Sequence, residues 1–160
     1  MKPASHPDAL RVQAALGPRF KVVEFDQSTK TSADAAAAVG CTVAQIAKSI
    51  MLKTMKDRRP VLVIASGINR VDEKKVSAVL GEKVKSADAD FVLANVGVQP
   101  GGVPPVGHKV PPIIVLDQDL NNYDVIWAAA GTSNAVFQLT WNDLIEITGG
   151  ISADIAKPVS

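Results

Sequence analysis

The residues that could do chemistry include a loop of twelve, from Gly97 to His108, that contains four glycines and three prolines. Such a composition excludes a regular helix or a central strand, because glycine loses most entropy when ordered and proline lacks an N–H donor. Val98, Val103 and Val106 alternate with the turn formers and can pack the loop down. A packed glycine-rich loop fixes backbone N–H groups that can bind a carbonyl oxygen or a phosphate. A plain crossover connection without a binding role fits the same residues.

Lys48 is the charged side chain that such a loop could use. It lies in the segment Ile46–Ile50, where we expect a short helix to pass into an apolar strand. A lysine in this position either extends its ammonium group to water or meets an anion. The local sequence alone favours the first outcome. If the loop folds beside Lys48, the pair would form a site for a phosphate or a polarised carbonyl.

Other reactive side chains give weaker signals. Cys41 precedes a predicted helix but has no nearby histidine partner, so we interpret it as a small buried residue. His6 and His108 are too isolated to form a metal site, although His108 could bind a ligand or close the turn. Ser133 lacks the Gly-x-Ser-x-Gly motif, and no phosphate or dinucleotide fingerprint is present. We therefore expect neither a metal nor another cofactor.

The length and composition are those of one domain with nearly equal numbers of acidic and basic residues. The chain has 160 residues and a formal charge of +1, which argues against a strongly basic nucleic-acid module but permits a local basic patch. A single cysteine excludes an internal disulfide, and the N-terminal residues lack the apolar run of a signal peptide. No apolar run approaches the roughly 18 residues of a membrane span. We expect a cytoplasmic protein without a membrane segment.

The elements that must position these residues mix helices and strands irregularly. Helices are predicted over 7–16, 33–39, 43–48, 72–81, 87–95 and 141–145, and strands over 20–26, 49–55, 60–65, 112–117, 125–130 and 135–139. Hairpins join 49–55 to 60–65 and 125–130 to 135–139. The pattern favours an α+β fold, a mixed β-sheet flanked by short helices. We predict a single domain over 1–160, with 1–6 and 150–160 loosely ordered.

Five segments, in this order, resemble the YbaK/EbsC family. They are Thr31–Ala36 followed by Gly40, Gln45–Ser49, Gly101–His108, Ala130–Ser133, and Asp143 with Leu144. The resemblance spans about residues 20–147, nearly the whole domain. Members of this family are similar to the editing insertion domain of bacterial prolyl-tRNA synthetase, and free-standing members hydrolyse mischarged aminoacyl-tRNA in trans.

The resemblance implies an ester hydrolase without a protein nucleophile. Lys48 corresponds to the family's functional lysine, which would engage the acceptor-end adenosine with its phosphate, or the ester. The glycine-rich loop would hold the aminoacyl carbonyl, and a water assisted by a hydroxyl of the terminal ribose would attack. The implied partners are the tRNA acceptor end and, as a further candidate, prolyl-tRNA synthetase. The implied substrate-binding residues are Phe25, Thr31, Gly101, Gly102, Val103, Pro104, Pro105, Gly107, His108, Gly131, Thr132 and Ser133.

Two departures leave the edited amino acid open among Ala, Ser, Thr and Cys, on tRNA-Pro or a related tRNA. The loop Gly101–His108 differs from the Pro-Phe-Gly-Leu form of the alanine-specific branch. The turn Gly131–Asn134 differs from the Gly-Gly-Lys-Arg of YbaK-type cysteinyl deacylases. Two alternatives from another class also remain. One is a module that binds aminoacyl-tRNA without hydrolysis, and the other is a small-ligand-binding domain unrelated to tRNA.

Overall fold

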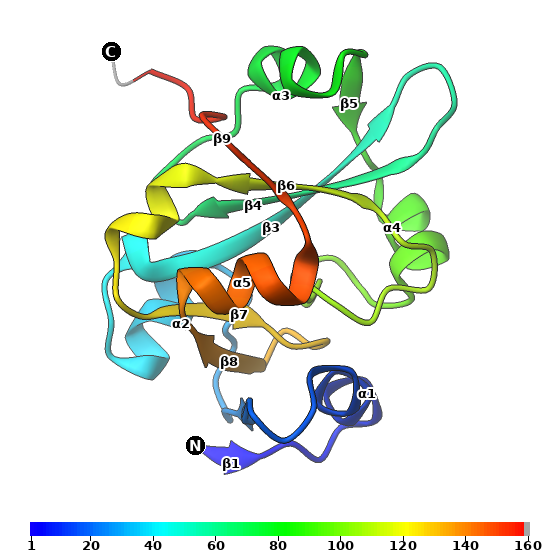
Figure 1. The fold of residues 1–160 in the computed structure, drawn as a ribbon. Helices are drawn as coiled ribbons and strands as arrows, with labels where there is room; N and C mark the ends of the chain where they lie inside the picture. The colour runs from blue at the N-terminus through cyan, green and yellow to red at the C-terminus, as the bar shows by residue number, and fades with distance from the viewer. Residues whose placement is uncertain (159–160) are drawn as a thin grey trace.

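The computed structural model describes residues 1–158 and is built around a mixed sheet of nine strands (Figure 1). The strands follow the spatial order β1-β2-β8-β7-β3-β4-β6-β9, and β5 pairs with β3. Their bounds are β1 (Lys2–Pro3), β2 (Val22–Glu24), β3 (Ile46–Thr54), β4 (Pro60–Ser66), β5 (Val84–Ser86), β6 (Ile113–Asp117), β7 (Ile126–Ala129), β8 (Ala135–Leu139) and β9 (Ile151–Ala153).

Short helices flank this sheet, so the predicted α+β class is confirmed. The α-helices are α1 (Pro7–Leu16), α2 (Ser32–Val39), α3 (Glu73–Leu80), α4 (Ala89–Val96) and α5 (Trp141–Thr148), and 3-10 turns lie at η1 (Val43–Gln45) and η2 (Gln118–Asn122). Local capping explains several helix starts. The side chains of Thr31 and Thr140 accept hydrogen bonds from backbone N–H groups three residues on, and Asp72 does so at α3.

Strand β4 lies at the centre of the core. Leu62 and Ile64 face one hydrophobic cluster and Val61 and Val63 face the other, and all four side chains are fully buried. A strand buried on both faces reads as a continuous apolar run. This is why the strand could be recognised in the sequence without any alternation of polar residues.

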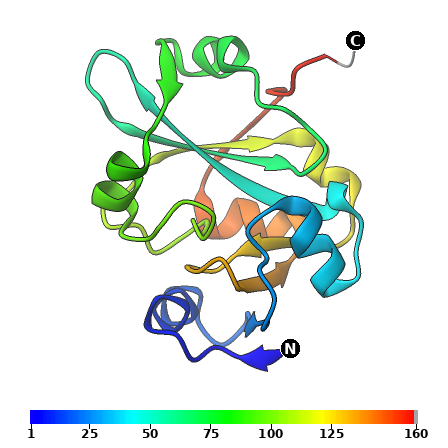
Figure 2. The same cartoon turned by 180° about the vertical axis from the view of Figure 1, so that it is seen from behind.

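Strand β3 positions the site because part of one edge is uncovered. β3 pairs with β4 along most of its length, with β7 only at Ile46 and Ala47, and with β5 only from Leu52 to Thr54. No strand among the described residues pairs with this edge at Lys48–Ile50. The gap between β7 and β5 is visible from behind in Figure 2. Unpaired strand edges expose backbone donors and acceptors.

Two predictions need correction. The helix expected over 43–48 is only a 3-10 turn, because β3 begins at Ile46, where the backbone pairs with Trp127. Lys48 therefore lies inside a strand. The terminal segments expected to be loose are also attached: β1 pairs with β2, β9 pairs with β6, and Ile155 is fully buried. Residues 159–160 of that prediction lie outside the described part of the chain.

Smaller differences concern element ends. The strand predicted over 20–26 is limited to β2, and the helix predicted to end at residue 145 continues through α5 to Thr148. Within residues 1–158, no helix combines the length and the apolar character needed to cross a membrane.

Candidate active site

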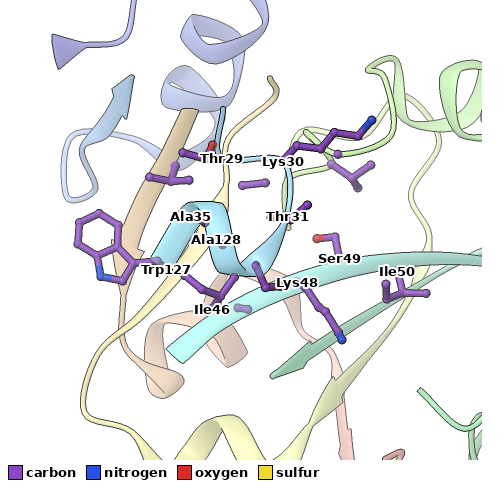
Figure 3. Close-up of a pocket in the computed structure, with 16 residues that line it drawn as sticks. Thr29, Lys30, Thr31, Ala35, Ile46, Lys48, Ser49, Ile50, Trp127 and Ala128 are labelled. Atoms are coloured by element: carbon purple, nitrogen blue, oxygen red, sulfur yellow. The ribbon is translucent and has the colours of Figure 1, made fainter. Parts of the chain in front are cut away.

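A cavity of about 250 Å³ lies at the uncovered edge of β3 (Figure 3). The start of α2, the first half of β3, strand β7 and the glycine-rich loop form its walls. Ile46, Ala128 and Val136 supply apolar lining, and Thr31 and Lys30 supply polar groups. A mainly apolar cavity with a few polar groups is typical of a small-molecule or cofactor site.

The glycine-rich loop contributes Gly101 and Val103 to this cavity. Among the hydrogen bonds formed within residues 1–158, none is donated by the N–H of either residue. Val103 is nonetheless buried, with 4% of its surface exposed. The N–H of Gly102 differs, because it donates to the carbonyl of Gln99 at 3.2 Å. Fixed N–H donors without a partner suit a developing oxyanion.

Gly102 instead fastens the loop to the β7–β8 turn. Its carbonyl accepts a hydrogen bond from the N–H of Gly131 at 2.8 Å. A Cβ at position 102 would lie 2.8 Å from the backbone N, Cα and C atoms of Thr132. Only glycine permits this close approach, so the composition of the loop has a packing reason at this position.

A second hollow of about 720 Å³ lies on the other side of Gly102. It is lined by five of the predicted substrate-binding residues, namely Phe25, Gly102, Gly131, Thr132 and Ser133. Lys30 lines both hollows, and its side chain runs along Gly101, where an added Cβ would lie 2.8 Å from the Lys30 Cγ. The predicted residues therefore gather around two neighbouring hollows with Lys30 between them.

Lys48 reaches out of the cavity rather than across it. Figure 3 shows the side chains of Lys48 and Ser49 leaving β3 in different directions, as expected for neighbours in a strand. The Lys48 ammonium donates to the carbonyl of Gly67 at 3.4 Å and to that of Asn69. The Asn69 side-chain amide donates at 2.8 Å to both Asp117 and Asp119. These bonds fix the backbone that holds the lysine.

Asp117 is the buried anchor of this network. It is 1% exposed and accepts further hydrogen bonds from the backbone N–H groups of Ser66 and Asp119, each at 3.0 Å. Burial lowers the pKa of Lys48 below 10.5; the charge of Asp117 opposes this shift, and the charge of Arg70 adds to it.

The second half of the loop lies elsewhere. Pro104 is buried and its carbonyl contacts Nε2 of His108 at 2.6 Å, while Pro105, Gly107 and His108 line a separate hollow beside α5. Burial lowers the pKa of the His108 imidazole. The structure therefore brings Thr31, Lys48, Gly101 and Val103 together around the cavity. The other four predicted residues of the loop, Pro104, Pro105, Gly107 and His108, do not line it.

Cys41 does not line the cavity, and burial raises the pKa of its thiol. Within residues 1–158, no group of three or more His, Cys, Asp or Glu side chains is placed to hold a metal ion.

Sequence reasoning missed Lys30, Asn69 and Asp117 as parts of the site. Lys30 directly precedes the Thr31–Ala36 segment of the family resemblance, so proximity along the chain could have indicated it. Asp117 ends an apolar strand, but nothing in the local sequence shows that its carboxylate faces the loop that binds Lys48.

Comparison with known proteins places this chain in a family. The model of the aminoacyl-tRNA editing domain matches residues 26–147. Protein YwhH of Bacillus subtilis (strain 168), which is uncharacterised, is 32% identical over 127 residues, covering 79% of this chain and 80% of that protein. The proline–tRNA ligase of Limosilactobacillus fermentum is 32% identical over 91 residues, which cover 54% of this chain but only 16% of the ligase.

A solved structure supports the same assignment. The crystal structure of a candidate trans-editing enzyme for prolyl-tRNA synthetase superimposes with a TM-score of 0.90 at 40% identity, covering 97% of this chain and all of that one. The chain described here belongs to the aminoacyl-tRNA editing domain family.

Proposed function

We propose that this protein is a free-standing deacylase that hydrolyses the ester bond of mischarged aminoacyl-tRNA in trans. The observation that carries the proposal is that one cavity is lined by Lys48 and by two residues, Gly101 and Val103, whose N–H groups have no acceptor within residues 1–158. We place the activity in the cytoplasm, with tRNA-Pro or a related tRNA as substrate and prolyl-tRNA synthetase as the candidate partner.

The cavity suits a small aminoacyl group. Its volume is about 250 Å³, and its apolar lining includes Ile46, Ala128 and Val136. An apolar pocket discriminates by only about 1–3 kcal/mol per methylene. The substrate amino acid is therefore proposed as a class of small residues, Ala, Ser, Thr or Cys, and the panel experiment below identifies the member.

In the proposed reaction, a water molecule attacks the acyl carbon while a hydroxyl of the terminal ribose assists its deprotonation. The new bond joins the water oxygen to the acyl carbon, the ester C–O bond breaks, and the ribose oxygen leaves with a proton. The N–H groups of Gly101 and Val103 stabilise the oxyanion, and the Lys48 ammonium holds the acceptor-end adenosine and its phosphate. Loss of one oxyanion donor in a related situation costs on the order of 3–4 kcal/mol in barrier.

The test is a panel of tRNAs charged with alanine, serine, threonine, cysteine or proline, each incubated with the parent protein and with Lys48→Ala. We expect release of one or two of the small amino acids by the parent and a strongly reduced rate for the variant. Release that does not depend on Lys48 would contradict the role given to the lysine. Binding of charged tRNA without release of any amino acid would instead indicate a non-catalytic module.

A further inference from the structure

A basic groove of about 250 Å³ adjoins the cavity at Lys48. Ile50 and Leu52 of β3 contribute apolar lining, and Arg70 and Lys157 contribute charged side chains. Lys48 and Ile50 line the groove as well as the cavity, so the two hollows meet at this part of β3.

The C-terminal segment places Lys157 beside Arg70. Val71 and Ala156 form an antiparallel bridge, and the N–H of Lys157 donates to the carbonyl of Arg70 at 2.8 Å. The buried Ile155 side chain fastens the segment to the core. Figure 1 shows this segment and α3 at the end of the molecule opposite β1 and β2. The two basic residues are therefore brought together by backbone pairing.

The groove has an excess of positive charge. Three cations, Lys48, Arg70 and Lys157, line it together with one carboxylate, that of Glu73. None of these four side chains forms an ion pair within residues 1–158. The nearby Lys75 differs, because it is paired with Asp154 at 3.1 Å. The charge of Arg70 also disfavours the charged form of Lys48, and an anion in the groove would relieve this repulsion.

We propose that this groove binds backbone phosphates of the tRNA acceptor strand, with Arg70 and Lys157 as phosphate-binding residues. The inference rests on the proposed function, which places the ester in the cavity. Because the cavity and the groove meet at Lys48 and Ile50, the nucleotides next to that ester would lie in the groove. Arginine and lysine are the side chains that neutralise nucleic-acid phosphates. The overall charge of +1 fits a small local contact rather than a broad basic surface.

The first test measures binding of uncharged tRNA to the parent protein, Arg70→Ala, Lys157→Ala and the double variant as KCl is raised. For single strands the slope of log K against log salt is about −0.7 for each phosphate neutralised. We expect each single variant to make the slope shallower by about 0.7 and the double variant by about 1.4. The matched control is Lys21→Ala, which changes an exposed lysine that directly precedes β2 and does not line the groove.

If Arg70→Ala and Lys157→Ala show the same slope of log K against log salt as the parent, the proposal that the groove binds phosphates is wrong. So would an equal change in Lys21→Ala, since binding would then follow net charge alone. This arm needs no hydrolysis, so it tests the groove even if the proposed deacylation fails.

A second arm compares mischarged tRNA with adenosine esterified by the same amino acid, which has no phosphates. Arg70→Ala and Lys157→Ala should raise KM for the tRNA and leave kcat near the parental value. Both variants should hydrolyse the adenosine ester as fast as the parent does. Equal losses on the two substrates would show that the substitutions disturb the cavity, and would contradict a phosphate-binding role.

Discussion

The ammonium group of Lys48 donates a hydrogen bond to the backbone carbonyl of Asn69. The Asn69 side-chain amide is in turn held by Asp117, which is buried at the end of β6. The candidate functional lysine is therefore positioned by a carboxylate that does not touch it. Asn69 and Asp117 thus hold the lysine in place, whereas the substrate would contact the lysine itself.

Asp117→Asn tests this positioning. The substitution keeps the shape of the side chain but removes a charge that favours protonated Lys48, so the pKa of Lys48 should fall further. We expect kcat for deacylation to fall on the order of tenfold, about 1.4 kcal/mol in barrier. We also expect the loss of activity at high pH to begin at a lower pH than in the parent. The matched control is Asp57→Asn in the exposed β3–β4 turn, which should leave the pH profile unchanged. An unshifted profile in Asp117→Asn would contradict the positioning role.

The titration of Lys48 itself makes a second prediction. Its pKa is lowered below 10.5 in the folded protein, mainly by burial, so the unfolded chain binds more protons between the folded pKa and 10.5. Stability relative to Lys48→Met should therefore rise with pH across that window. Activity that depends on the ammonium group should fall across the same window. Urea unfolding and deacylation rates measured from pH 7 to 10.5 check both signs, and parallel pH profiles of stability in the two proteins would refute the shift.

How much the sequence could predict depends on whether the cause is local. The helix starts at Thr31 and Asp72 follow from capping side chains, and β4 follows from its own apolar run. The place of Lys48 inside β3 depends on pairing between Ile46 and Trp127, which are far apart in the chain. No local pattern could therefore have ended the predicted helix before Lys48.

The candidate site shows the same division. Composition alone identified the glycine-rich loop as shaped and packed. Its division at Pro104, however, depends on tertiary contacts, since Gly102 packs on Thr132 while His108 closes on the Pro104 carbonyl. The role of Asp117 depends on a loop more than 45 residues earlier in the chain, as the hydrogen bonds from Ser66 and Asn69 show.

Gly102→Ala tests whether the attachment of the loop matters. The added Cβ would lie 2.8 Å from the Thr132 backbone, so the loop must move, at a cost of about 1–3 kcal/mol in stability. We expect deacylation to be lost together with this packing. Gly97→Ala is the matched control: its φ of +92° imposes backbone strain of about 1–2 kcal/mol, but the nearest atom to its Cβ is 3.9 Å away. If Gly102→Ala keeps the same deacylation rate as a similarly destabilised Gly97→Ala, attachment of the loop at Gly102 is not required.

Glu24 fastens the N-terminal segment and gives a prediction at acid pH. Its carboxylate accepts hydrogen bonds from the N–H groups of Ser5 at 2.8 Å and His6 at 2.9 Å, and these bonds hold the pKa of Glu24 below 4.5. The attachment should be complete above pH 4.5 and lost as the pH falls through the lowered pKa. The hydrogen-exchange protection factors of residues 5–6, which correct for the slower intrinsic exchange in acid, should therefore fall in acid and in Glu24→Gln at neutral pH. Unchanged protection in Glu24→Gln would contradict this anchor.

The central claim is tested most directly by single-turnover deacylation of the mischarged tRNA that the panel identifies. The parent, Lys48→Ala and the control Lys56→Ala would be compared, the last changing an exposed lysine in the β3–β4 turn. The account predicts that Lys48→Ala slows hydrolysis on the order of 10²-fold, because the acceptor end is no longer held in position for attack on the ester, while Lys56→Ala keeps the parental rate. A folded Lys48→Ala protein that releases the amino acid as fast as the parent would contradict it.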